Sequence, residues 1–144
     1  MKRTLTSIIS IISVTSLLSL GGGARAQADC TNASLKGTYG ITCEGALGGS
    51  PAAEVGIATY DGKGKVSGKS TISINGTILK DVPFEGTYTL NADCTGTIFG
   101  TLGNLNLSLH FVLVDGGREI YFIIASIPRS LVVYGVRKKI SQDE

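Results

Sequence analysis

The stretch KVSGKSTISING, residues 65–76, alternates regularly between two kinds of side chain. One face of residues 65–74 carries small or apolar residues and the other carries polar ones, which is typical of a half-buried β-strand. Asn75-Gly76 follows at once, and this pair favours a two-residue hairpin because both residues accept a positive φ. The stretch therefore predicts a strand that turns back directly into an antiparallel neighbour.

On either side of this strand, turn signals rich in Gly, Asn, Asp and Pro separate seven more strand-like segments. They cover residues 35–45, 54–60, 82–90, 95–102, 105–114, 118–126 and 131–139. The Gly-rich segment 45–51 is predicted to be a mobile loop. An open sheet would leave two unpaired edges, which closure removes. The sequence therefore predicts an all-β fold, an eight-stranded antiparallel up-and-down barrel.

Residues 1–26 differ from everything that follows and have the layout of a cleaved signal peptide. Lys2 and Arg3 form a basic start, an apolar stretch comes next, and small residues surround the predicted cleavage point after Ala26 or after Ala28. The apolar stretch is shorter than the ~20 apolar residues that a membrane-spanning helix requires. These features predict a secreted or periplasmic protein that is not stably inserted in a membrane after cleavage.

The remaining residues, 27–144, are predicted to form a single β-barrel domain. Removing residues 1–26 takes away three basic residues, so 10 Lys and Arg remain against 11 Asp and Glu and the net charge becomes −1. The small basic cluster at 137–139 is expected to be solvated. This balance argues against a nucleic-acid partner, which needs a clustered basic face.

Three cysteines in an exported chain allow at most one intramolecular disulfide, and three pairings are possible. Cys43 shares a strand face with apolar residues and is expected to be buried. Cys30 and Cys94 lie at strand ends, where a bridge forms more easily. We therefore expect a disulfide between Cys30 and Cys94 and a free, buried Cys43.

The predicted inner face carries five aromatic side chains, which are the candidates for lining a ligand site: Tyr39, Phe84, Tyr88, Phe111 and Phe122. An eight-stranded barrel is either filled by its own side chains or holds one small ligand. The first alternative is a structural or interaction protein with a filled core and an oligomerising outer face. The second is a binding protein for a small apolar ligand, and it is the one we favour.

The first predicted strand contains Gly37-Thr38-Tyr39, which resembles the Gly-x-Trp signature of the calycins, the lipocalin and avidin-like barrels. In that family the aromatic residue closes the barrel floor, and a basic residue of the last strand packs over it. The resemblance implies that Gly37, Tyr39 and Arg137 close the barrel. The chain is also similar to a loose group of small bacterial exported proteins that share Gly-Thr-Tyr, an Asp-Gly-x-Gly hairpin and Asp-Cys-Thr-Gly, a likeness that implies no activity.

No residue pattern indicates catalysis, a metal site or a cofactor. His110 is the only His and falls on the polar face of its strand, and no Gly-x-Ser-x-Gly nucleophile motif is present. Glu44 and Glu54, beside the Gly-rich segment, are expected to be solvated charges, as are Asp81 and Glu85. We therefore expect a protein that is not an enzyme, with an allene-oxide-cyclase-like barrel as the remote alternative.

The predicted strands between residues 105 and 139 are apolar on both faces. Seven side chains with outward parity would form a contiguous apolar patch: Val112, Val114, Tyr121, Ile123, Val132, Tyr134 and Val136. Soluble monomers rarely leave such a patch uncovered. We expect a second copy of the chain to cover it in a twofold homodimer.

Overall fold

The computed structural model describes residues 29–126 and 131–140, so the predicted signal peptide and its cleavage point lie outside the described residues. The described chain forms eight strands and two short 3₁₀ helices. In order these are η1 (Asn32–Ser34), β1 (Lys36–Leu47), β2 (Ser50–Asp61), β3 (Lys65–Ile74), β4 (Thr77–Leu90), β5 (Thr95–Leu102), β6 (Leu105–Val114), η2 (Asp115–Gly117), β7 (Glu119–Ser126) and β8 (Leu131–Lys139).

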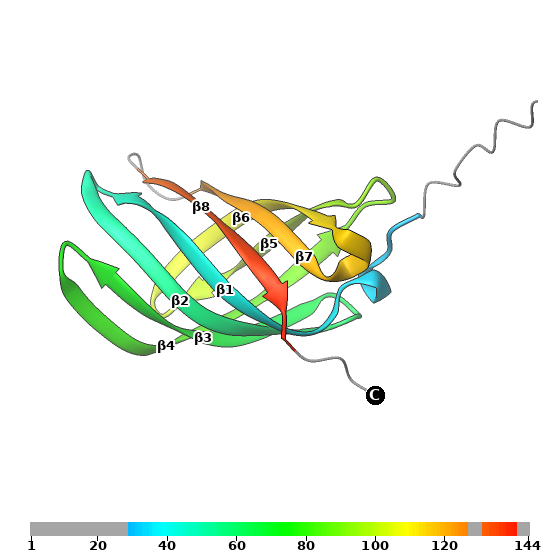
Figure 1. Ribbon diagram of the computed structural model, residues 1–144, viewed down its shortest axis with the longest axis horizontal. Coiled ribbons are helices and arrows are strands. Elements are labelled where there is room, and N and C mark those ends of the chain that lie inside the picture. Colours follow the sequence, from blue (N-terminus) through cyan, green and yellow to red (C-terminus); the bar gives the residue numbers. More distant parts are fainter. Residues whose placement is uncertain (1–28, 127–130, 141–144) are drawn as a thin grey trace, which may run out of the picture.

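Each strand pairs with the next along the chain in antiparallel fashion, and β8 pairs with β1. In Figure 1 the cyan β1 accordingly lies beside the red β8. The β1–β8 ladder runs from Tyr39↔Lys139 to Leu47↔Leu131 and closes the sheet. The prediction of an all-β, eight-stranded antiparallel up-and-down barrel is therefore confirmed.

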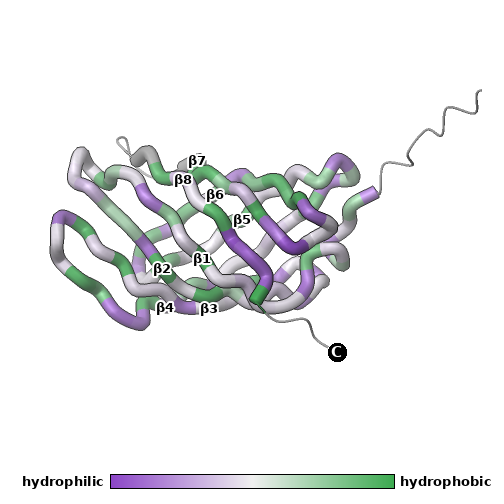
Figure 2. The backbone as a smooth tube through the Cα atoms, viewed as in Figure 1, coloured by the Kyte–Doolittle hydropathy of each residue, from purple (hydrophilic) through white to green (hydrophobic). Residues whose placement is uncertain are grey.

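Residues that alternate along each strand point in turn to the inside and to the outside of the barrel. On β4, Phe84 and Tyr88 are buried, whereas Glu85 and Thr87 between them are exposed. Figure 2 shows the difference between regions of the barrel: β7 is hydrophobic over most of its length, whereas the colour along β3 and β4 changes repeatedly. A strand that buries one face needs apolar residues only at alternate positions.

The segment 45–51, predicted to be a mobile loop, is instead part of a hairpin. β1 and β2 stay paired up to Leu47↔Ser50, and Gly48 and Gly49 form a two-residue turn with φ values of 59° and 82°. Positive φ at both positions matches the twist of the flanking strands and is unfavourable for most residues with a Cβ atom. The Gly-rich composition thus marks a tight turn and not a loop.

β4 begins directly after the predicted hairpin turn and is longer than expected. Its pairing with β3 shifts between Ser70↔Val82 and Ile72↔Leu79, so β4 contains one additional residue there. Asp81 has a φ of 52° within this bulge. Because of the additional residue, Leu79 and Val82 both face the barrel interior, which strict alternation does not allow.

The two ends of the barrel differ (Figure 1). The β1–β2, β3–β4 and β5–β6 turns lie at one end, which we call the open end. The 3₁₀ helices lie at the other, which we call the capped end. There a disulfide joins Cys30 to Cys94, with Cα atoms 5.0 Å apart, and ties the segment before η1 to the β4–β5 turn. The predicted pairing is confirmed, and Cys43 is free and buried as expected.

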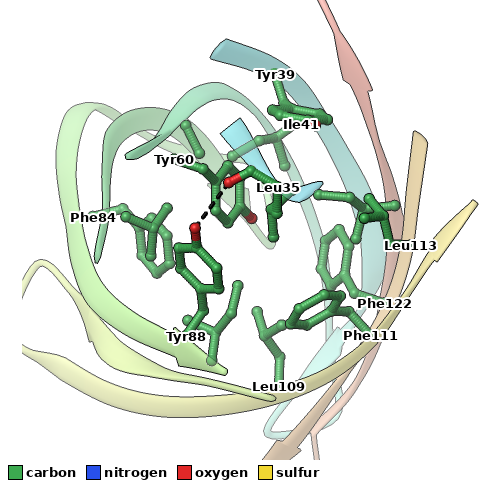
Figure 3. Packing of buried hydrophobic residues seen from close by; sticks show 14 of the residues in the cluster. Leu35, Tyr39, Ile41, Tyr60, Phe84, Tyr88, Leu109, Phe111, Leu113 and Phe122 are labelled. Atoms are coloured by element: carbon green, nitrogen blue, oxygen red, sulfur yellow. Dashed lines mark hydrogen bonds between the residues drawn. The ribbon is translucent and has the colours of Figure 1, made fainter. Parts of the chain in front are cut away.

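Large side chains fill the capped half of the barrel. Leu35 and Tyr39 have no exposed surface, and Tyr60 is 1% exposed. The Tyr60 ring packs edge-on against Tyr39 and against Tyr88, with ring centroids 5.3 Å apart in each pair. The Tyr88 hydroxyl lies 2.8 Å from the Leu35 carbonyl oxygen, a hydrogen bond drawn in Figure 3. The tyrosines and the chain around η1 together seal this end.

Candidate functional site

The open end of the barrel contains a cavity of about 520 Å³. All eight strands contribute to its wall, and most of the lining side chains are aliphatic: Leu47, Ile72, Ile74, Leu79, Val82, Leu102, Leu105, Leu107, Ile124 and Val133. Small-molecule sites typically have this size and an apolar lining with a few placed polar groups. The cavity is therefore the candidate ligand site.

Among the described residues that line the cavity, Glu54 on β2 is the one with a charged side chain. Its Oε1 accepts a hydrogen bond from the Ser70 hydroxyl, and its Oε2 accepts one from the Cys43 thiol at 3.2 Å. A Cβ atom at position 56 would lie 2.3 Å from the Ser70 oxygen, so Gly56 makes room for this contact. A carboxylate, a hydroxyl and a thiol thus form a small polar cluster beside an aliphatic wall.

Glu54, expected to be a solvated charge, is half-buried and lies on the inward face of β2, where it lines the cavity. Ala58 and Tyr60 share its parity and are buried. That shared parity is the signal that could have placed Glu54 inside the barrel from the sequence. The other three carboxylates expected to be solvated are exposed: Glu44, Asp81 and Glu85.

Cys43 lines the cavity from β1, but its thiol is not activated as a nucleophile. Burial raises the pKa of its thiol, and the neighbouring Glu54 carboxylate raises that pKa further through its charge and its hydrogen bond, against a smaller opposing effect of Arg137. The thiolate, and not the thiol, is the nucleophile and the metal ligand. At neutral pH Cys43 is therefore a protonated hydrogen-bond donor to Glu54.

Arg137 extends from β8 into the core and is 4% exposed. Its guanidinium carbon lies 4.8 Å from the ring centroid of Phe122, 5.3 Å from that of Phe84 and 5.8 Å from that of Tyr60. It also donates a hydrogen bond to the Tyr60 hydroxyl. Cation–π attraction is strongest where the cation is removed from water, as it is in this cage.

The structure gives Arg137 different partners from the expected Tyr39. The Tyr39 hydroxyl donates to the Gly117 carbonyl in η2, and Tyr60 contacts both Tyr39 and Arg137. The reason is register: Arg137 is paired with Ile41, two residues farther toward the open end than Tyr39. The basic residue of the last strand therefore packs against Tyr60, Phe84 and Phe122 and not over Tyr39.

The five aromatic candidates are all buried, and none of them lines the cavity: Tyr39, Phe84, Tyr88, Phe111 and Phe122. Figure 3 shows their rings packed with aliphatic side chains inside the barrel. Gly37, predicted with Tyr39 as part of the closure, is buried at the start of β1. The predicted lining therefore differs from the lining of the cavity, because large rings fill the space that they face and leave no room beside them.

The predicted outer patch is partly exposed. Four of its side chains are among the exposed large hydrophobic residues: Val112, Tyr121, Ile123 and Tyr134. Val114 and Val136 are half-buried, and the side chain of Val132 lies outside the described ones. The pairs Val112↔Tyr121 and Ile123↔Tyr134 set the exposed residues side by side across β6, β7 and β8. The homodimer stays a prediction, which sedimentation at micromolar concentration would test.

Three further observations concern His110, metal binding and membrane-spanning helices. His110 is exposed on the outside of β6, as expected. No three His, Cys, Asp or Glu residues within the described ranges are grouped so that they could hold a metal ion. None of the helices in the described part of the chain has the length and apolar character needed to cross a membrane.

No family model matches the chain, and no significant match is found among curated proteins or solved structures. The closed eight-stranded barrel is compatible with the calycin fold. A functional argument for this protein therefore rests on the cavity and on the residues that line it.

Proposed function

We propose that this protein is a secreted or periplasmic binding protein that holds a small apolar ligand in the open-end cavity. The observation that carries the proposal is the cavity of about 520 Å³ with its aliphatic wall. Burying apolar ligand surface there contributes roughly 25 cal/mol for each Å² removed from water. A barrel with a purely structural role would be more stable with this volume filled, because empty interior space is destabilising.

Export is supported by the Cys30–Cys94 disulfide, since disulfides persist mainly in oxidising compartments. The signal-like sequence of residues 1–26 supports it independently. Binding rather than catalysis is favoured by the groups that face the cavity. The Cys43 thiol has a raised pKa, and the histidine that could act as a base is on the outside.

A test is the binding of a neutral, environment-sensitive apolar dye to the mature protein. In Ala52→Trp an indole ring would occupy the cavity that Ala52 lines. In the matched control Thr89→Trp the ring would project from the exposed face of β4. We expect Ala52→Trp to weaken dye binding by about tenfold or more, the effect of losing roughly 1.4 kcal/mol of contact, and Thr89→Trp to leave it unchanged.

Native mass spectrometry of protein purified from its own host gives an independent measurement. We expect an excess mass that disappears after extraction with organic solvent. The proposal is wrong if the wild-type protein binds no apolar dye, or if the two tryptophan variants bind the dye equally well.

A further inference from the structure

Glu54 has hydrogen-bonding capacity that the described part of the protein does not use. A carboxylate offers about four lone-pair positions. The Ser70 hydroxyl occupies one on Oε1, and the Cys43 thiol occupies one on Oε2. The side chain belongs to a half-buried residue that lines the cavity. Acceptor positions on both oxygens are therefore available to a molecule inside the cavity.

The charge of Glu54 is also unmatched at close range. The ion pairs of the described residues lie elsewhere, namely Lys69–Asp81, Arg118–Asp115 and Lys138–Glu119. The other residues that line the cavity are uncharged. The charge of the buried cation Arg137 reaches Cys43, but Arg137 is enclosed by three aromatic rings, forms no ion pair with Glu54 among the described residues and is not part of the cavity wall. A carboxylate beside an apolar wall is costly unless an opposite charge and hydrogen bonds compensate it.

We propose that the ligand is an apolar amine, whose hydrocarbon body fills the cavity and whose ammonium group binds Glu54. This inference rests on the proposed binding function. An ammonium group has three donors, which suits the free acceptor positions on the two carboxylate oxygens. Hydrogen bonds between ionised partners are about twice as strong as neutral ones. The ligand would thus supply the charge that the cavity wall lacks.

Other head groups fit this wall less well. A carboxylate head would place a second negative charge against Glu54, and like charges in such a site repel. A hydroxyl head could donate one hydrogen bond to Glu54 but would leave its charge unmatched. For one and the same hydrocarbon chain, affinity should therefore fall from amine to alcohol to carboxylate.

The test is a calorimetric titration of the mature protein at pH 7 with octylamine, octanol and octanoate, which share one hydrocarbon chain. We expect octylamine to bind about tenfold or more tightly than the other two, the scale of one hydrogen bond to a charged group. Glu54→Gln should abolish this preference while octanol still binds. Glu85→Gln, the same chemical change at an exposed position of β4, should preserve it.

Each result decides between the two proposals. If all three compounds bind equally well, if octanoate binds most tightly, or if the preference survives in Glu54→Gln, the amine inference is wrong and the binding function stands. If none of the three binds, the proposed function fails and the amine inference fails with it. The ranking in the wild-type protein decides the matter even if Glu54→Gln does not fold.

Discussion

The capped half and the open half of this barrel use the same strands and are filled differently. In the capped half the inward positions hold rings, such as Tyr39 on β1 and Tyr60 on β2, and the interior is packed. In the open half the same two strands present Cys43 and Ala52, and a cavity of about 520 Å³ remains. These two strands stay paired through both halves, from Lys36↔Asp61 to Leu47↔Ser50.

The comparison shows that side-chain volume, and not the backbone, decides where this barrel is hollow. The circumference of a closed barrel is set by strand number and stagger, so neighbouring layers enclose similar volumes. Inward-facing aromatic side chains fill the capped half at the density of a protein core. The smaller side chains of the open half do not reach that density. Stability should therefore depend mainly on the capped half, and ligand binding mainly on the open half.

The largest expected effect contrasts one truncation in each half. Ile98 has no exposed surface, so Ile98→Ala should lower the free energy of unfolding by ~2–5 kcal/mol through lost burial and a new cavity. Leu79 is 46% exposed at the cavity wall, so Leu79→Ala should cost less than about 1 kcal/mol. Chemical denaturation measures both losses, and similar losses would contradict the division of the barrel into two unlike halves.

A smaller effect is expected at the boundary between the halves. Arg137→Ala removes the guanidinium from its three aromatic rings and should lower stability by about 2 kcal/mol, the size of a desolvated cation–π contact. Lys138→Ala, at the next and exposed position, is the matched control and should be nearly neutral. Thermal unfolding compares the two variants, and equal melting temperatures would show that the cage does not stabilise the barrel.

The smallest effect concerns alkaline pH. Burial, helped by Tyr60 and Tyr88, raises the pKa of Tyr39 from 10.0 to about 12. The folded state thus holds this proton more tightly than the unfolded chain. Its contribution to stability is complete below about pH 10 and is lost as the pH rises toward 12.

Tyr39→Phe should therefore make the fall in stability above pH 10 less steep. Tyr121→Phe removes an exposed hydroxyl on β7 and serves as the control. Unfolding by urea at several alkaline pH values gives the two slopes. If both variants follow the wild-type curve, the Tyr39 hydroxyl is more accessible to water than the packing of the capped half indicates.

Local patterns in the sequence were sufficient to predict the eight strands and their order in the barrel. Period-two alternation over 65–74 and the Asn75-Gly76 turn lie where they were predicted. The disulfide was also predictable, because Cys30 and Cys94 sit at strand ends, whereas Cys43 has the parity of a buried residue. The strands and turns depend on residues close together in the chain, and the disulfide was inferred from where each cysteine lies along its strand and on which face.

The candidate site could be located only from the tertiary structure. Which inward residues meet across the interior depends on the stagger between strands, and the stagger is fixed only when β1 pairs with β8. That register sets Arg137 among the rings of Tyr60, Phe84 and Phe122 and not over Tyr39.

The bulge in β4, which turns both Leu79 and Val82 inward, left no clear mark in the alternation pattern. The sequence by itself therefore determined that the chain closes into a barrel and which residues turn inward on most strands. Only the tertiary structure decided which half stays hollow, and so that the inward-facing Glu54 meets a cavity and not a packed core, because the filling of an interior depends on side chains from all eight strands at once.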